Sequence, residues 1–227
     1  MFDINHIISL VGSVLLVLVA TVLHEVAHGA TANALGDDTA KRMGRITLNP
    51  FKHLDLVGSV VLPLLMALVG GPIFAFAKPV PYDPRKLRHP VRDEVLVALA
   101  GPACNLLQAC IGAGVFRGVI AYLTQAGITY PIPTQWEVAL DIIATFVYLN
   151  LMLMFFNLIP LPPLDGSAII SPLLRGRARD VYYTVQRNSM PVLLALLYLL
   201  PMVLHINPVS IYLNATAEPL AVLLLGF

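Results

Sequence analysis

Long apolar runs alternate with short polar intervals along the chain. The runs predict helices at about residues 7–35, 93–124, 136–158, 189–206 and 209–226, and one more apolar stretch covers 56–77. Most of these runs approach or exceed the ~20 residues that a helix needs to cross a hydrocarbon core of about 30 Å. The pattern therefore predicts an all-α polytopic membrane protein with about five transmembrane helices.

The composition agrees with a membrane protein. The chain has 227 residues, of which 58% are hydrophobic and 12% are charged, and its mean hydropathy is +0.80. An ordinary soluble domain has roughly 25% charged residues. The net charge of +1 gives no indication of a nucleic-acid partner. Because the longest polar interval, 78–93, is too short to fold alone, we expect one membrane-embedded domain over 1–227.

The basic residues predict which loops face the cytoplasm. They fall into three groups, which are Lys41, Arg42, Arg45 and Lys52; Lys78, Arg85, Lys86, Arg88 and Arg92; and Arg175, Arg177, Arg179 and Arg187. Loops rich in Lys and Arg stay on the cytoplasmic side of a membrane. Because the first two groups flank 56–77, a simple crossing by that stretch would place one group outside.

The stretch 56–77 is therefore predicted to be a re-entrant segment, which enters the membrane and returns to the same face. Pro63 lacks a backbone donor, and the Gly-Gly-Pro sequence at 70–72 breaks a helix. All basic residues except Arg117 then become cytoplasmic, while the uncharged loop at 125–135 and the N-terminus lie outside. An ordinary span with a weak charge bias is the alternative.

The first predicted helix carries the motif HEVAH at residues 24–28. His24 and His28 are four residues apart, so on a helix their side chains project about 40° apart and can reach one ion. In the HExxH arrangement two imidazoles bind zinc, and the glutamate, here Glu25, acts as a base. An ionisable side chain near the bilayer centre costs roughly 2.5 to 3.5 kcal/mol and normally has a functional partner. The motif therefore indicates a zinc site more than a chance pattern.

A catalytic zinc site needs a third protein ligand and an open position. We expect Asp165 as this ligand, because the helix at 136–158 runs inward from the outer face and the prolines within 160–163 end it near the cytoplasmic face. His24 lies roughly 25 Å along a helix that enters from outside, so it reaches a similar depth. For Asp165 alone, an Asx turn or a helix cap before Gly166 would be the simpler interpretation.

Other polar residues leave alternatives open. His53 and Asp55 lie close to the same membrane face and could supply a replacement ligand, although a role in orienting their loop is favoured because Asp165 already completes the set. Asn105 lies on a predicted helix that also carries Gly101 and Pro102. Its amide could bind a substrate backbone, or it could hold two helices together, as amides often do in membranes.

Four stretches carry most of these polar residues. They are HEVAH at 24–28, GRITLNPFKHLDLVGS at 44–59, AGPACN at 100–105 and NLIPLPPLDG at 157–166. Together they resemble the motif series of the site-2 protease family of intramembrane zinc metalloproteases, in a minimal form without PDZ or CBS domains. The resemblance covers about 7–175, which would be the catalytic core, and leaves a C-terminal helical hairpin at about 189–226.

The resemblance implies a role for individual residues. In that family the HExxH histidines and the aspartate of the last motif bind zinc, the HExxH glutamate is the catalytic base, and the asparagine that opens the last motif helps to hold the substrate. The residues at these positions are His24, His28 and Asp165 as ligands of one zinc ion per chain, and Glu25 and Asn157 as catalytic residues.

The implied function is hydrolysis of peptide bonds within or near the transmembrane segments of membrane-protein substrates. The chain would then be an integral protein of a bacterial cell membrane, with its N-terminus outside and its active site toward the cytoplasmic face. A membrane metal transporter or another metal-binding membrane protein could use the same ligands, but it would give Glu25 and Asn157 no role. A scaffold with an accidental motif would bind little zinc.

Overall fold

The computed structural model describes residues 4–55, 78–128 and 131–226, and every regular element within these ranges is helical. The helices are α1 Ile4–Ala34, α2 Thr39–Arg42, α4 Pro90–Gln125, α5 Thr134–Asn157, α6 Asp165–Ile170, α7 Arg177–Arg187, α8 Ser189–Leu194, α9 Leu200–Leu204 and α10 Pro208–Leu225. Short helical turns are η1 Pro50–Lys52, η3 Pro84–Lys86, η4 Ser171–Leu173 and the π-type η5 Ala195–Leu199.

The prediction of an all-α polytopic membrane protein is confirmed. Four helices of the described ranges are long and apolar enough to cross a membrane, namely α1 over Gly12–Ala34, α4, α5 and α10. A fifth candidate is the pair Arg177–Arg187 and Ser189–Leu204, whose two parts are bent by 87°. The predicted re-entrant segment at 56–77 lies outside the described residues.

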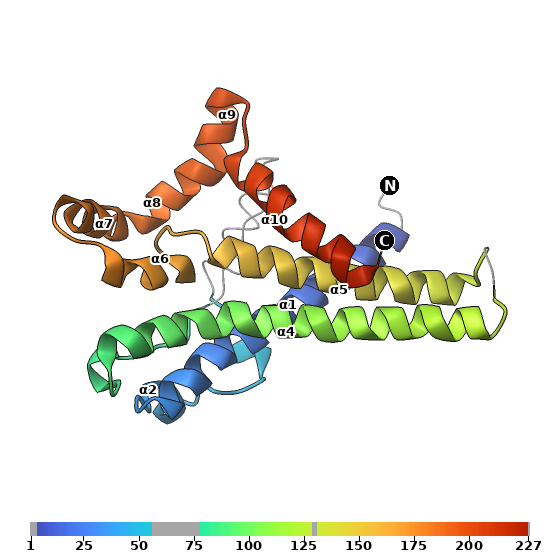
Figure 1. The fold of residues 1–227 in the computed structure, drawn as a ribbon, viewed down its shortest axis with the longest axis horizontal. Coiled ribbons are helices and arrows are strands. Elements are labelled where there is room, and N and C mark those ends of the chain that lie inside the picture. Colours follow the sequence, from blue (N-terminus) through green and yellow to red (C-terminus); the bar gives the residue numbers. More distant parts are fainter. Residues whose placement is uncertain (1–3, 56–77, 129–130, 227) are drawn as a thin grey trace.

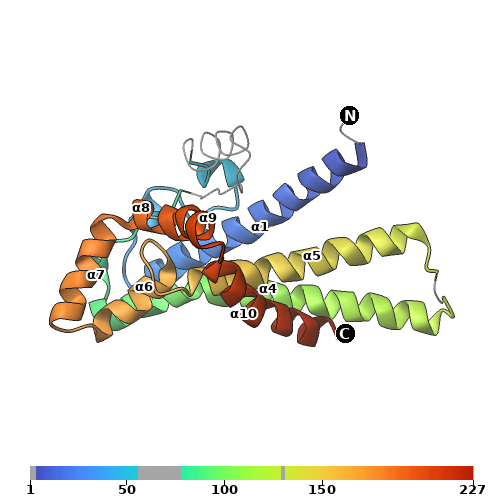
Figure 2. The ribbon, with the colours of Figure 1, turned by 90° about the horizontal axis from the view of Figure 1, so that it is seen from above.

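The helices α4 and α5 lie side by side, and α1 crosses them (Figures 1 and 2). α10 packs on α5 and α4, and the buried apolar residues of these three helices form the main core. Gly112 brings α4 and α5 close together, because a Cβ there would lie only 2.9 Å from Cγ2 of Val147. Small residues at helix contacts are the usual means of close packing in membranes.

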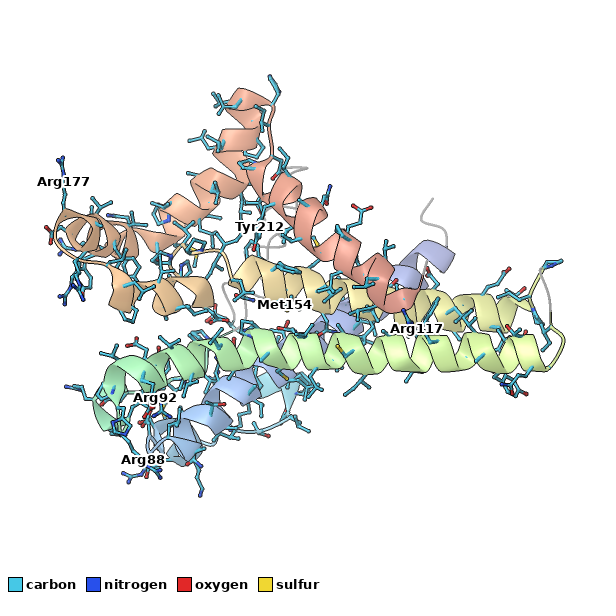
Figure 3. The ribbon with its side chains drawn as sticks, in the orientation of Figure 1. Arg88, Arg92, Arg117, Met154, Arg177 and Tyr212 are labelled. Carbon is cyan, nitrogen blue, oxygen red and sulfur yellow. The ribbon has the colours of Figure 1, made fainter. Side chains whose placement is uncertain are left out.

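Basic side chains gather at one end of the molecule. Arg88 and Arg92, at the start of α4, and Arg177, at the start of α7, lie at the end remote from the loop between α4 and α5 (Figure 3). Arg117 lies farther along α4, where its Nη2 donates to the carbonyl oxygen of Leu223, 2.7 Å away. Arg117 thus satisfies a carbonyl at the C-terminal end of α10, where such groups lack helical partners.

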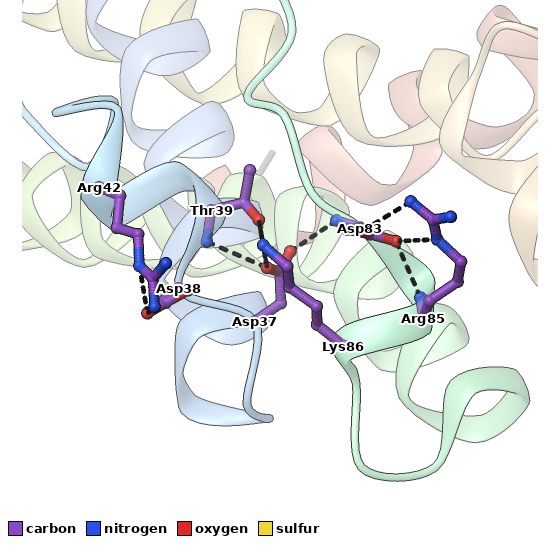
Figure 4. A network of polar contacts seen from close by, with 7 residues as sticks. All are labelled: Asp37, Asp38, Thr39, Arg42, Asp83, Arg85 and Lys86. Atoms are coloured by element: carbon purple, nitrogen blue, oxygen red, sulfur yellow. Dashed lines mark hydrogen bonds and ion pairs between the residues drawn. The ribbon is translucent and has the colours of Figure 1, made fainter.

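A polar network joins the loop after α1 to the segment that precedes α4 (Figure 4). Asp37 is fully buried, and its carboxylate accepts hydrogen bonds from the backbone N–H of Thr39 and from the backbone N–H of Asp83, 2.6 Å away. Burial would raise the pKa of Asp37, but its hydrogen bonds to Thr39 and Asp83 and the nearby Lys86 ammonium lower it. The ionised carboxylate therefore holds residues 78–89 against the end of α1.

Two further contacts join the residues just before 56–77 to the residues just after it. The backbone N–H of Lys78 donates to the carbonyl oxygen of His53, 2.8 Å away, so the chain leaves and re-enters the described structure at one place. Arg45 is 6% exposed, and its Nη2 donates to the carbonyl oxygens of Lys78, at 2.8 Å, and Pro79, at 3.3 Å. The segment beginning at Lys78 is thereby fixed against the part of the chain that follows α2.

Candidate metal centre

Three predicted ligands meet at one point between α1 and α6. Nε2 of His24 and Nε2 of His28 are 3.0 Å apart, and Oδ2 of Asp165 lies 3.2 Å from the first and 3.3 Å from the second. Both imidazoles are buried, with 5% and 8% exposure. Among the described residues these three form the one group of potential metal ligands whose donor atoms lie this close together.

The α6 aspartate reaches the two histidines because the chain turns sharply after α5. α5 ends at Asn157, and the prolines within 160–163 prevent the helix from continuing, so the chain turns before α6 starts at Asp165. Gly166 lies directly against the turn, and a Cβ there would be 2.6 Å from the carbonyl oxygen of Ile159. Only glycine allows this approach, which explains the Asp-Gly pair.

The outer ring nitrogens of both histidines face hydrogen-bond acceptors. Nδ1 of His28 lies 2.6 Å from the carbonyl oxygen of Val97, and Nδ1 of His24 lies 2.5 Å from Oδ1 of Asn105. Each Nδ1 must therefore carry the proton, which leaves Nε2 of each neutral ring with a lone pair. Metal-binding histidines show this arrangement, in which the second nitrogen donates to a carbonyl or carboxylate.

The donor set fits a divalent metal ion. Oδ2 of Asp165 is buried without a hydrogen-bond donor, and it faces two unprotonated nitrogens. Three lone pairs within 3.3 Å repel one another unless a cation lies among them. A tetrahedral zinc ion with bonds of about 2.0 to 2.2 Å holds its ligand atoms roughly 3.3 to 3.6 Å apart, close to the separations found here.

The Asp165 carboxyl group is ionised at neutral pH. The carboxyl group of an aspartate has an ordinary pKa of about 3.9, well below neutral pH. The carboxylate form is the one that binds a metal ion.

The α4 backbone closes one side of the site. A Cβ on Gly101 would lie 2.5 Å from Cε1 and 2.6 Å from Nε2 of His24, and closer still to Nε2 of His28. Any side chain at this position would displace both imidazoles. The glycine of the AGPACN motif therefore provides the space in which the ligands meet.

Glu25 lies beside the ligands but outside the cluster. It is half-buried, and its Oε2 accepts a hydrogen bond from the backbone N–H of Val80, 2.8 Å away. Val80 follows Lys78 and Pro79, whose carbonyl oxygens bind Arg45. The segment 78–80 thus links a buried guanidinium to the carboxylate of the HExxH motif.

The remaining candidate residues take different positions. Asn157 is half-buried at the end of α5, and its Nδ2 donates to the carbonyl oxygen of Leu153 at 3.0 Å. His53 is 1% exposed and its Nε2 lies 2.8 Å from the carbonyl oxygen of Thr47, within its own loop and outside the metal cluster. Asn105 is fully buried and contacts His24 and Asn150.

Sequence reasoning did not single out Arg45 or Asn150. Arg45 belongs to a basic group whose other members, Lys41, Arg42 and Lys52, are exposed, so its burial could not be predicted from charge alone. Asn150 is a fully buried amide in the middle of the apolar helix α5. A polar residue at that depth normally has a specific partner, and this was the available signal.

Comparison with known proteins agrees with the geometry. The family model of peptidase family M50 matches residues 12–200. A Bacillus subtilis protein named "Putative zinc metalloprotease YwhC" is 40% identical over 162 residues, which cover 71% of this chain and 68% of that protein. "Putative zinc metalloprotease Rip2" of Mycolicibacterium smegmatis is 32% identical over 157 residues, covering 69% of this chain and 55% of that protein.

A third relative extends over more of the chain. "Putative zinc metalloprotease Rip2" of Mycobacterium tuberculosis strain H37Rv is 29% identical over 187 residues, which cover 81% of this chain and 65% of that protein. No solved structure matches the chain. With the family model covering most of the sequence, the chain belongs to peptidase family M50.

Proposed function

We propose that the chain is a zinc-dependent intramembrane endopeptidase, which hydrolyses peptide bonds within or near transmembrane segments of membrane proteins. The observation that carries the proposal is the meeting of Nε2 of His24, Nε2 of His28 and Oδ2 of Asp165 within 3.3 Å, next to the carboxylate of Glu25. Family membership and the names of the relatives support the same chemistry.

His24, His28 and Asp165 would hold one zinc ion, which would supply a Lewis acid for the scissile carbonyl group and for the attacking water. Glu25 accepts the proton of the attacking water and delivers it to the leaving nitrogen. Its contact with Val80 through Oε2 directs the carboxylate and leaves the other oxygen as the proton acceptor. A transporter that used the three ligands would have no need of this base.

Asn157 is proposed to bind the substrate. A carboxamide nitrogen carries two hydrogens, and one of them goes to the Leu153 carbonyl oxygen. The second can be donated to the carbonyl oxygen of the scissile bond, where negative charge develops during hydrolysis. Asn157 ends α5 eight residues before Asp165, which begins α6, and this short connection supports the proposal.

The depth of the site supports an intramembrane substrate. His24 lies within the candidate span Gly12–Ala34, about 15 Å from the C-terminal end of α1 at about 1.5 Å per residue. The basic end of the molecule, marked by Arg88, Arg92 and Arg177, is the cytoplasmic end by the positive-inside rule (Figure 3). The N-terminus of α1 is then outside and the site lies toward the cytoplasm.

Metal removal and restoration test the proposed activity. The purified full chain in proteoliposomes is incubated with a single-span membrane protein that carries a fluorescent reporter on each side of its transmembrane segment. We expect cleavage to stop after treatment with a chelator and to return with about one zinc ion per chain. Undiminished cleavage by the metal-free protein would contradict a zinc mechanism.

Labelling of single cysteines tests the orientation. Leu48→Cys and Arg85→Cys place thiols at exposed positions on either side of 56–77, in a chain whose two natural cysteines are replaced by serine. We expect both thiols to react only with a reagent supplied from the cytoplasmic side. Reaction of one of them from outside would make 56–77 a complete span and would refute the re-entrant segment.

A further inference from the structure

A chain of buried amides leads from the middle of α5 to the metal centre. Nδ2 of Asn150 lies 2.9 Å from the carbonyl oxygen of Phe146, Oδ1 of Asn150 lies 2.9 Å from Nδ2 of Asn105, and Oδ1 of Asn105 lies 2.5 Å from Nδ1 of His24. Asn105 and Asn150 are both 0% exposed. The three helices α1, α4 and α5 are thus joined by one hydrogen-bonded path that ends at a metal ligand.

The direction of this path is fixed at its far end. The Phe146 carbonyl oxygen can only accept hydrogen bonds, so the Asn150 side chain must present its nitrogen there and its oxygen toward α4. Asn105 must then present its nitrogen to Asn150, and its oxygen to His24. Nδ1 of His24 consequently carries the proton.

The two histidines are held in the same tautomer by different means. His28 donates to the Val97 backbone carbonyl, which cannot be reversed. His24 donates to an amide, and a rotation of the Asn105 carboxamide by 180° would present its NH₂ group instead. Nδ1 of His24 would then act as an acceptor and Nε2 would take the proton, so this nitrogen could no longer bind a metal ion.

We propose that Asn150 is a positioning residue for the metal centre, which prevents reversal of the Asn105 amide and thereby holds His24 in the tautomer that binds zinc. Asn105 acts as the direct partner of the ligand and Asn150 as the group that sets the direction of Asn105. The inference rests on the zinc-binding part of the proposed function and concerns residues that take no part in the hydrolysis itself.

Gln108 provides the matched control for an amide that only joins helices. It is 6% exposed on α4, one turn after Asn105, and its Nε2 lies 3.4 Å from the Ala20 carbonyl oxygen on α1. Its hydrogen bonds among the described residues go to Ala20 and Cys104 and to none of the three metal ligands. Gln108→Leu therefore removes a buried interhelical amide and leaves the path to His24 intact.

The first experiment measures zinc affinity by competition with a chelator on the full chain in detergent. Loss of a group that orients a metal-bound histidine typically lowers metal affinity about 10- to 100-fold. We expect Asn150→Leu to fall in this range and Gln108→Leu to bind zinc like the parent protein. Asn150→Ala makes the same comparison if the leucine variant does not fold, as judged by Tm.

Repeating the measurement in Asn105→Asp protein shows whether Asn150 acts by setting the orientation of the Asn105 amide or only by packing. Asn105→Asp presents a carboxylate, whose two oxygens both accept a hydrogen bond, so its reversal changes nothing for His24. In this background, adding Asn150→Leu should lower zinc affinity no more than Gln108→Leu does. An equal loss in both backgrounds would mean that Asn150 acts through packing, and would overturn the proposal.

Nitrogen NMR of the metal-free protein, with ¹⁵N-labelled histidine, reports the tautomer directly. We expect His24 to carry its proton on Nδ1 in the parent protein and in Gln108→Leu, and to populate the Nε2–H tautomer in Asn150→Leu. An unchanged tautomer together with unchanged zinc affinity would refute the proposal. Failure of the parent protein to bind zinc would instead refute the proposed function, so the two failures are distinguishable.

Discussion

The two histidine ligands and the candidate base, Glu25, share one turn of α1 but are held by different parts of the molecule. The ligand side comprises His24 and His28, whose Nδ1 atoms contact the helix α4 through Asn105 and Val97. The base side comprises Glu25, which receives one backbone hydrogen bond from a segment without helical structure. The ligand side is therefore part of the helical core, whereas the base side depends on how the segment 78–80 is placed.

This difference implies that metal binding and catalysis can be separated by substitution. Buried helix contacts position the ligands, so changes there should lower zinc affinity and rate together. The segment that contacts Glu25 is held by Arg45 and by the buried Asp37 carboxylate, and both of these residues follow α1 in the chain. Changes there should lower the rate while zinc stays bound.

Removal of a ligand should have the largest effect. Asp165→Ala leaves two protein ligands, and we expect the purified protein to lose most of its zinc and all measurable cleavage. His53→Ala removes a buried histidine whose Nε2 lies 2.8 Å from the carbonyl oxygen of Thr47 in its own loop, so it should keep about one zinc per chain. Metal analysis of both variants decides the third ligand, because retention of zinc by Asp165→Ala with loss in His53→Ala would reverse the assignment.

Gly101→Ala should lower zinc affinity without removing a metal ligand. The added Cβ would lie within 2.6 Å of His24, and strain of this kind costs about 1 to 3 kcal/mol, so we expect zinc affinity to fall roughly tenfold or more. Gly114→Ala on the same helix meets no atom within 4 Å and serves as the control. Equal zinc affinities of the two variants, measured by chelator competition, would mean that α4 does not enclose the site as described.

Arg45→Met should affect the base side alone. It removes the hydrogen bonds to the carbonyl oxygens of Lys78 and Pro79, and hydrogen bonds to charged groups contribute about 1.5 to 3 kcal/mol. We expect the cleavage rate to fall about tenfold, since 1.4 kcal/mol corresponds to a factor of ten. Zinc content should not change.

Arg42→Met is the control for Arg45→Met, because Arg42 is exposed and pairs with Asp38 on the surface, where ion pairs contribute little. Rate and zinc content are measured on the same preparations of both variants. Loss of zinc in Arg45→Met would contradict the separation of the two sides.

Much of the fold could be predicted from hydrophobic periodicity. The apolar runs at 7–35 and 136–158 correspond to α1 and α5 within a few residues, because long uninterrupted runs leave little choice of structure. α7 was not predicted, since its 11 residues carry four charges and lack an apolar run. The helix expected at 189–206 is interrupted by a π-type turn at Ala195–Leu199, which apolar periodicity does not reveal.

The metal ligands of the site could be predicted, because they belong to recognisable sequence motifs. HExxH spacing and the depth of Asp165 were sufficient to expect the three side chains at one place, and the structure brings them together. The groups that hold them could not be predicted, because Asn105 is 81 positions from His24 and Asn150 a further 45 away. Such contacts depend on how helices rotate against one another, which the order of residues on one helix does not specify.

The most direct test of the account is the zinc content and cleavage rate of Glu25→Gln, measured on the same proteoliposome samples. Gln keeps the size of the side chain, and Glu25 lies outside the ligand cluster, so this variant should bind about one zinc per chain. Without the base, cleavage of a membrane-embedded substrate should fall by about 10² to 10⁴. Cleavage at the parent rate by zinc-loaded Glu25→Gln protein would contradict the proposed mechanism.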